Sequence, residues 1–129
     1  MNMVPRPRQN DADPVWDTSE PILHRLMGVI ESRKVAEPKA SYVARLLQDG
    51  RAAIGAKITE EAAELVEAAA EPGDVGKQSL IHEVADLWFH SLVMMGWRGV
   101  SLEEVEQELE RRFGVSGLCE KRSRTEPNS

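Results

Sequence analysis

The stretch that decides the fold is KITEEAAELVEAAAEPGDVGKQSLIHEVADLWFHSLVMMGW, residues 57–97. It contains two acidic pairs, Glu61 with Glu64 and Glu83 with Asp86, and each pair has the i, i+3 spacing. Residues three apart lie on the same side of an α-helix, so each spacing places both carboxylates on one helix face. The stretch therefore predicts two helices that each present a pair of acids.

The first helix is predicted over residues 57–71. At about 100° per residue, its apolar side chains form one stripe. The stripe consists of Ile58, Ala62, Leu65, Val66 and Ala69. Glu60 and Glu67 fall nearly opposite the stripe, and we expect them in solvent, as on any acidic helix face. Glu61 and Glu64 lie between these two sides, with Glu61 close to the edge of the stripe.

The second helix is predicted over residues 76–97 and repeats this arrangement. Its stripe consists of Leu80, Val84, Leu87, Ser91, Met94 and Met95. Glu83, Asp86 and His90 lie on the flank of that stripe. Further apolar residues cover the rest of the helix: Ile81, Trp88, Phe89, Leu92, Val93 and Trp97. A helix that is apolar nearly all round is expected to be buried on several sides.

The acids on this second helix need a compensating charge, because an unpaired buried carboxylate is costly. No Lys or Arg occurs between Gln78 and Trp97 to pair with them. The turn predicted at residues 71–74 brings the two helices together as antiparallel neighbours, so the two acid pairs can face each other. A cation held by the four carboxylates would supply the missing charge.

Carboxylate ligands suit Mg²⁺ or Mn²⁺, and Mg²⁺ commonly shares its coordination shell with substrate phosphates. Such a metal can neutralise phosphate charge and activate a water, so hydrolysis of a phosphate ester or anhydride is the expected chemistry. The alternative is that the acids are an ordinary solvated helix face. The residues favour that alternative for Glu60 and Glu67, and they favour function for Glu83 and Asp86.

The composition indicates a single domain of 129 residues with a net charge of −6. This charge gives no support to binding of a nucleic-acid backbone. The single cysteine, Cys119, excludes an internal disulfide and fits a reducing compartment. The beginning of the chain has no signal-peptide pattern, and no apolar run approaches the roughly 20 residues of a membrane span. We therefore expect a soluble cytoplasmic protein with no membrane partner.

The remaining segments complete an all-α chain in which no strand is predicted. Residues 1–19 are expected to be a disordered arm, and residues 119–129 a mobile tail that holds Cys119. A helix is predicted from about residue 20 to Arg33, in which His24 has no carboxylate at a useful spacing. Residues 51–56 are interpreted as a connector. Ser101 is expected to cap the last helix through a capping box with Glu104.

A basic segment lies between the first helix and a short helix that Ser41 caps and Gly50 ends. It carries Arg33, Lys34, Lys39, Ser41, Tyr42 and Arg45. Two interpretations stay open for it, a phosphate clamp and a scatter of solvated side chains. Lys57 lies one turn before Glu60 and Glu61 and can reach either a carboxylate or a phosphate.

The acid pattern, Glu61-x-x-Glu64 and then Glu83-x-x-Asp86 after eighteen residues, resembles that of the all-α (MazG-like) nucleoside triphosphate pyrophosphohydrolases. Within them the chain is most similar to the phosphoribosyl-ATP pyrophosphohydrolase family of histidine biosynthesis. The similar segments are ESRKVAEPKASYVARLLQDG (31–50), KITEEAAELVEAA (57–69), EVADLWFHSLVMM (83–95) and RGVSLEEVEQELERRF (98–113). The resemblance covers residues 20–118.

This resemblance implies a compact homodimer of about five helices per chain, in which both subunits complete a four-helix core. It implies Mg²⁺-dependent conversion of phosphoribosyl-ATP to phosphoribosyl-AMP and pyrophosphate, with Mn²⁺ as a substitute metal. The implied metal ligands are Glu61, Glu64, Glu83 and Asp86. Glu60 would support them as a further catalytic residue. The implied substrate-binding residues are Arg33, Lys34, Ser41, Tyr42, Lys57 and His90.

The chain departs from the family pattern at Thr59, His82, Trp88 and Trp97, and none of these is one of the four acids. Two other functions remain as alternatives. One is removal of non-standard or deoxynucleoside triphosphates by the same chemistry. The other is a non-catalytic helical dimer that acts as an adaptor.

Overall fold

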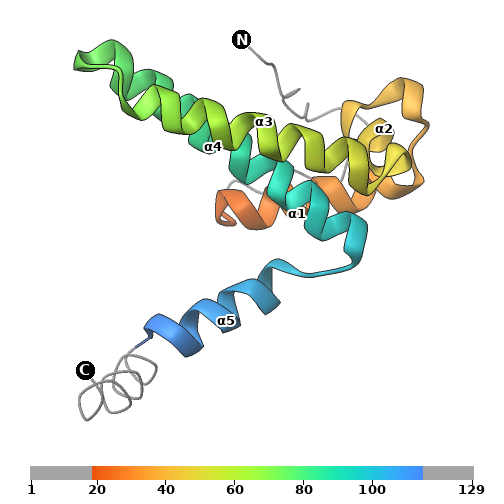
Figure 1. Ribbon diagram of the computed structural model, residues 1–129. Coiled ribbons are helices and arrows are strands. Elements are labelled where there is room, and N and C mark those ends of the chain that lie inside the picture. The colour runs from red at the N-terminus through yellow and green to blue at the C-terminus, as the bar shows by residue number, and fades with distance from the viewer. Residues whose placement is uncertain (1–18, 115–129) are drawn as a thin grey trace.

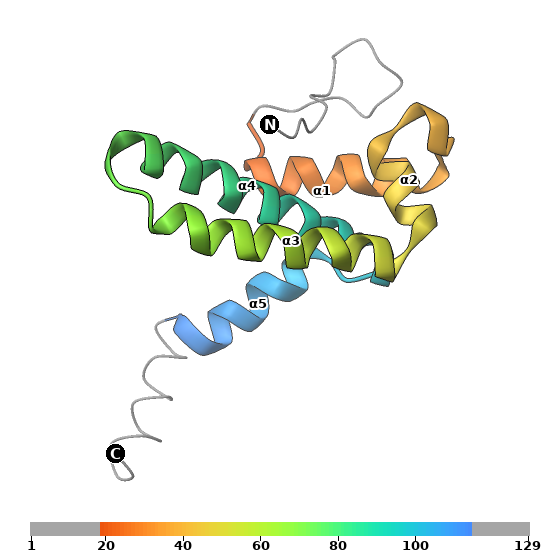
Figure 2. The same ribbon diagram turned by 45° about the horizontal axis from the view of Figure 1, so that its top comes forward.

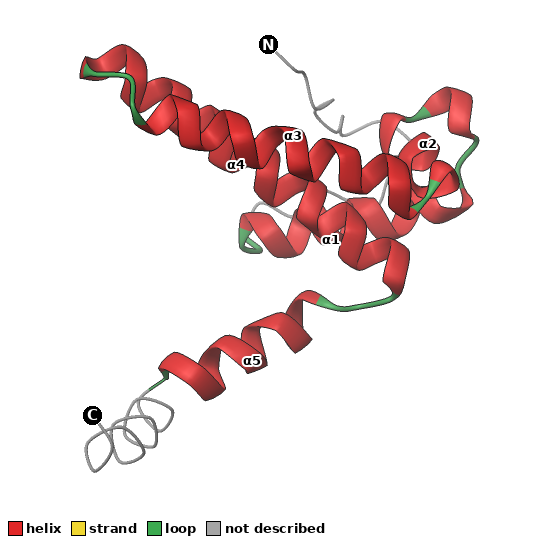
Figure 3. Ribbon diagram, viewed as in Figure 1, coloured by secondary structure: helices red, strands yellow, loops and turns green. Residues whose placement is uncertain are grey.

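The protein is helical throughout residues 19–114, the part that the computed structural model describes, and this part contains no strand (Figure 3). The elements in order are α1 (Ile22–Ser32), the 3₁₀ turns η1 (Arg33–Val35) and η2 (Pro38–Ala40), α2 (Tyr42–Asp49), α3 (Arg51–Ala69), α4 (Gly73–Arg98) and α5 (Leu102–Phe113). The all-α prediction is confirmed. The predicted tail, with Cys119, and residues 1–18 of the predicted arm lie outside the described residues.

Helices α3 and α4 form a long antiparallel hairpin. The two helices lie side by side in both views (Figures 1 and 2). The chain reverses at the predicted turn, and α4 begins at Gly73, which has a φ of 73°. A residue with a side chain rarely adopts this conformation, so glycine suits the position. The hairpin therefore places the two acid-bearing segments next to each other, as the sequence predicted.

Helix α3 begins at Arg51, so the interpretation of residues 51–56 as a connector was wrong. Gly50 has a φ of 88°, and its carbonyl accepts a hydrogen bond from the Ile54 amide at 3.1 Å. One glycine therefore ends α2 and starts α3 without any loop between them. Ile54 is completely buried, and its packing holds this first turn of α3 against the core.

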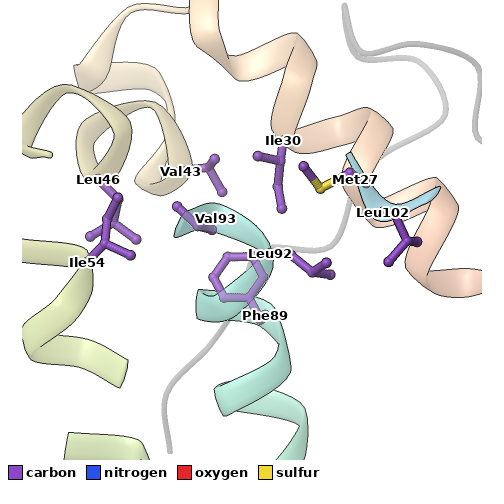
Figure 4. Close-up of a cluster of buried hydrophobic side chains, with 9 residues drawn as sticks. All are labelled: Met27, Ile30, Val43, Leu46, Ile54, Phe89, Leu92, Val93 and Leu102. Atoms are coloured by element: carbon purple, nitrogen blue, oxygen red, sulfur yellow. The ribbon is translucent and has the colours of Figure 1, made fainter. Parts of the chain in front are cut away.

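The hydrophobic core lies at the end of the hairpin away from its turn, where α1 and α2 pack against α3 and α4 (Figure 4). It is made of Met27, Ile30, Val43, Leu46, Ile54, Phe89, Leu92, Val93 and Leu102. The acids follow this core along α3 and precede it along α4, so they lie between the core and the hairpin turn. Close packing of the core residues fixes the register of the two helices beside the acids.

The apolar stripe predicted for the first acidic helix is not buried within the chain. Val66 is 68% exposed, whereas Glu61 is only 2% exposed. On α4, Ile81 and Trp88 are also more than half exposed, so the expectation of burial on several sides was wrong for a single chain. The periodicity identified an apolar face of the helix, but the chain buries the neighbouring face, which carries Glu61.

Helix α5 projects away from the rest of the molecule after a short link (Figure 1). The predicted capping box at its start is present, with Ser101 and Glu104 each bonding to the other's backbone amide. His24 of α1 lies 2.9 Å from Glu106 and 3.3 Å from Glu103. His24 thus has carboxylate partners after all, which local spacing could not reveal. None of the helices in residues 19–114 combines the length and apolarity that a membrane crossing requires.

Candidate functional site

The two acid pairs line one pocket, a cavity of about 830 Å³ between α3 and α4. The lining comes from both helices and consists of Lys57, Glu60, Glu61, Glu64, Gln78, Ser79, Ile81, His82, Glu83, Ala85 and Asp86. The sequence predicted, from the spacing of the acids and the turn between the helices, that the two pairs face each other. All five candidate catalytic acids and Lys57 lie around this single cavity.

Glu61 is the most buried of the acids. Burial raises the pKa of its carboxyl to about 7, and the nearby negative charge of Asp86 adds to this effect. Its Oε1 atom is buried and lies 2.6 Å from the Nδ1 atom of His90. The folded chain therefore keeps this carboxyl oxygen away from water, against a buried imidazole nitrogen.

Glu83 repeats this pattern on the facing helix. Its pKa is raised by burial and by the neighbouring carboxylate of Glu64. Glu83 Oε1 is also buried and has no hydrogen-bond partner within residues 19–114. Each helix thus contributes one buried carboxyl oxygen to the pocket wall, and the mutual repulsion of the acids favours any cation that enters.

Lys57 is a basic residue of the pocket lining. Its ammonium Nζ lies 3.2 Å from Glu60 Oε1, and this hydrogen bond raises the pKa of Lys57. Glu60 is exposed, as the helical wheel predicted, although it lines the rim of the pocket. Lys57 therefore remains an ammonium at the edge of an otherwise acidic cavity.

Three polar residues of the lining were not predicted as site residues. His82 Nε2 lies 3.2 Å from Asp86 Oδ2, one helical turn away. Gln78 and Ser79 lie a further turn toward the start of α4. The sequence contained the signal for them, because residues four, seven and eight positions before Asp86 share its helix face.

His90 does not line the pocket. It is completely buried, with its Nδ1 atom 2.6 Å from Glu61 Oε1 and 3.0 Å from the Asp86 backbone carbonyl. Its Nε2 atom lies 2.8 Å from the Tyr42 hydroxyl. Within a single chain, His90 and Tyr42 therefore contact the acids and each other, and substrate binding by them stays a prediction.

Three further predicted substrate-binding residues, Arg33, Lys34 and Ser41, also lie outside the acid pocket, whereas Lys57 lines it. Lys34 pairs with Glu31 at 3.0 Å and borders a second cavity of about 450 Å³ beside Trp97. The Ser41 hydroxyl accepts a hydrogen bond from the Ala44 amide, so it caps α2 as predicted. Arg33 is in η1, which is likewise absent from the pocket lining. Within a single chain, the basic segment and the acids are therefore separate.

A family model described as phosphoribosyl-ATP pyrophosphohydrolase matches residues 23–113. The chain belongs to this family. A relative named phosphoribosyl-ATP pyrophosphatase from Rhodopirellula baltica is 51% identical over 102 residues, which are 79% of this chain and 85% of the relative. A relative with the same name from Nitrosomonas eutropha is 46% identical over 109 residues, 84% of this chain and 91% of the relative.

The residues of this phosphoribosyl-ATP pyrophosphohydrolase family member fit a magnesium ion by their chemistry. Four carboxylates line one cavity, and Glu83 Oε1 is buried there with no hydrogen-bond partner among residues 19–114. Oxygen ligands of this kind are those that Mg²⁺ and Mn²⁺ prefer. Among residues 19–114 no three acidic, histidine or cysteine side chains already converge on one point. Binding would therefore draw the carboxylates together, which their mutual repulsion opposes until a cation is present.

Proposed function

We propose that this protein hydrolyses phosphoribosyl-ATP to phosphoribosyl-AMP and pyrophosphate in a Mg²⁺-dependent reaction, the second step of histidine biosynthesis. The observation that carries the proposal is the pocket lined by both acid pairs, with buried carboxyl oxygens on Glu61 and Glu83. The names of the relatives support the choice of substrate. A small-molecule nucleotide is thus the proposed partner, and Mn²⁺ is the proposed substitute metal.

The residues that would hold the metal are Glu61, Glu64, Glu83 and Asp86. When bound, the metal supplies positive charge for the triphosphate oxygens and lowers the pKa of an attacking water. In the reaction, water adds to a phosphorus of the α–β anhydride, the bridging P–O bond breaks, and pyrophosphate leaves. The carboxylates contribute mainly by position, since phosphoryl chemistry depends on alignment and electrostatic stabilisation.

Lys57 would neutralise part of the charge on the triphosphate. Its ammonium lies at the rim of the acid pocket and is already held by Glu60. A fixed cation beside the transferring group stabilises the charge of the transition state without having to reorganise. In this proposal Glu60 orients Lys57, which gives a physical role to an exposed acid that does not belong to either pair.

The functional unit in this proposal is a homodimer. Val66, Ile81 and Trp88 are each more than half exposed on α3 and α4, although large apolar side chains are normally covered. A second copy that packs on this face would complete a four-helix core around both hairpins. We further propose that the enzyme acts in the cytoplasm.

The test is release of pyrophosphate from phosphoribosyl-ATP with Mg²⁺, beside a panel of ordinary and deoxynucleoside triphosphates. Asp86→Asn is the blank, because it removes one proposed ligand and keeps the side-chain shape. Selective release from phosphoribosyl-ATP that is lost in this variant is the expected result. Release from the panel alone would assign the protein to removal of nucleoside triphosphates. Release from neither would refute the catalytic proposal and favour the helical adaptor.

A further inference from the structure

The buried imidazole of His90 contacts two of the acid residues, one on each helix of the hairpin. Its Nδ1 atom lies 2.6 Å from Glu61 Oε1 on α3 and 3.0 Å from the backbone carbonyl of Asp86 on α4. The ring has no exposed surface, and Glu61 is almost as buried. One side chain therefore contacts the acid pair of α3 and the acid pair of α4 at the same time.

The neighbours of the ring determine its tautomer. The Asp86 carbonyl is an acceptor, and so is an ionised Glu61 carboxylate, so the Nδ1 atom between them must carry the proton. In the neutral ring Nε2 then has a free lone pair, and the Tyr42 hydroxyl at 2.8 Å is placed to donate to it. The Tyr42 hydroxyl thus donates a hydrogen bond to His90 Nε2, and His90 Nδ1 donates one to Glu61.

Packing holds the ring in this orientation. The ring of Phe89 lies edge-on to it at a centroid distance of 4.8 Å, and the ring of Tyr42 does so at 5.9 Å. Tyr42 is in turn stacked with Phe89 at 6.3 Å. The imidazole is therefore fixed by two aromatic neighbours and by polar contacts at both nitrogens. In this orientation the ring has no exposed surface and no free nitrogen.

We propose that His90 and Tyr42 are positioning residues, which hold the Glu61 carboxylate at the pocket wall in the arrangement that binds the metal. This inference rests on the proposed metal-dependent function and gives both residues a role other than substrate contact. Residues that orient metal ligands commonly change metal affinity by about 10- to 100-fold when they are altered. Tyr42 begins α2 and acts from a different part of the chain than the hairpin that carries the acids.

The first test is the tautomer of His90 in the metal-free protein, read from nitrogen NMR of histidine-labelled protein. The chain has only three histidines, so single substitutions assign their signals. We expect the neutral form with the proton on Nδ1. The form protonated on Nε2, or the doubly protonated ring, would overturn the proposed arrangement. This readout does not depend on activity or on metal.

The second test is Mn²⁺ binding, followed by electron paramagnetic resonance of the free ion. Tyr42→Phe removes only the hydroxyl and keeps the aromatic packing, and we expect it to weaken Mn²⁺ binding by about tenfold. His90→Leu should weaken it more, and His90→Asn, which keeps a donor near the Nδ1 position, should bind better than His90→Leu. His24→Gln is the matched control, because it breaks a histidine–carboxylate contact far from the pocket.

The outcomes separate this inference from the function on which it rests. If the wild type binds Mn²⁺ and hydrolyses phosphoribosyl-ATP while Tyr42→Phe and His90→Leu bind Mn²⁺ normally, only the positioning role is refuted. If the wild type binds no Mn²⁺, the metal-dependent function is refuted and the positioning role with it. Should His90→Leu fail to fold, Tyr42→Phe and the tautomer of the wild type decide the matter.

Discussion

Removing the buried charge of Glu61 should stabilise the metal-free protein at alkaline pH. The pKa of this carboxyl rises from 4.5 to about 7 on folding, mainly because the side chain is buried. The folded state therefore binds the proton more tightly than the unfolded state, so stability falls as pH rises from 4.5 to 7. Since one pKa unit corresponds to about 1.4 kcal/mol, the full loss above pH 7 is about 3 kcal/mol.

Glu61→Gln keeps the size of the side chain and cannot ionise. In chelator-treated protein at fixed concentration, we expect urea denaturation to show the variant more stable than the wild type by up to about 3 kcal/mol at pH 8. At pH 4.5 and below the two should be nearly equal, because Glu61 is then protonated in the wild type. The same variant should lose most of the stabilisation that Mg²⁺ gives the wild type, since it loses a ligand oxygen's charge.

Glu60→Gln is the matched control, since it removes the same charge one position earlier at an exposed site. It should not reproduce the gain in stability between pH 4.5 and pH 8. A Glu61→Gln variant whose stability follows that of the wild type across this pH range would refute the reasoning. It would mean that burial does not raise the pKa of Glu61 in the absence of metal.

Three further changes test the site and the packing beside it. Glu64→Gln should lower the rate of Mg²⁺-dependent pyrophosphate release by at least about 100-fold with the circular dichroism spectrum unchanged, and near-normal turnover would remove it from the site. Gly96→Ala should destabilise the protein by about 1–3 kcal/mol in urea denaturation, because an added Cβ would lie 2.8 Å from Ile30 Cγ2. Gly28→Ala is its control: the space there is open, and a gain of about 0.5–1 kcal/mol is expected. Ser101→Ala should cost about 1 kcal/mol by the same measurement, since it removes the α5 cap.

Local patterns predicted well which segments form helices, and they predicted poorly which face of each helix is covered by the rest of the chain. The capping box of Ser101 and the cap at Ser41 were predicted because they depend on residues three apart. The start of α3 was missed because no polar capping residue marks it, and the backbone of Gly50 makes the junction instead. Val66 was expected inside because periodicity shows that a helix has an apolar face, but not what covers that face.

The same division holds for the site. The acid pairs were found because spacing along one helix is a local property, and a short turn brings two such helices together. His82 could have been found by the same rule, since it lies one turn before Asp86. The contact of His90 with Tyr42 joins residues 48 positions apart, and no pattern along a single helix contains it. It depends on how α2 packs against α4, which the core decides.

All residues that line the acid pocket lie between Lys57 and Asp86, in one uninterrupted hairpin. The pocket lining is therefore one continuous segment of sequence, whereas the contact that holds Glu61 depends on His90 and Tyr42, which lie outside that segment. For protein engineering, this separates two tasks. Libraries aimed at new nucleotide substrates can keep residues 57–90 and Tyr42 constant and randomise the rest of the basic segment and α5, so that each clone inherits the same acids and differs in the surfaces around them.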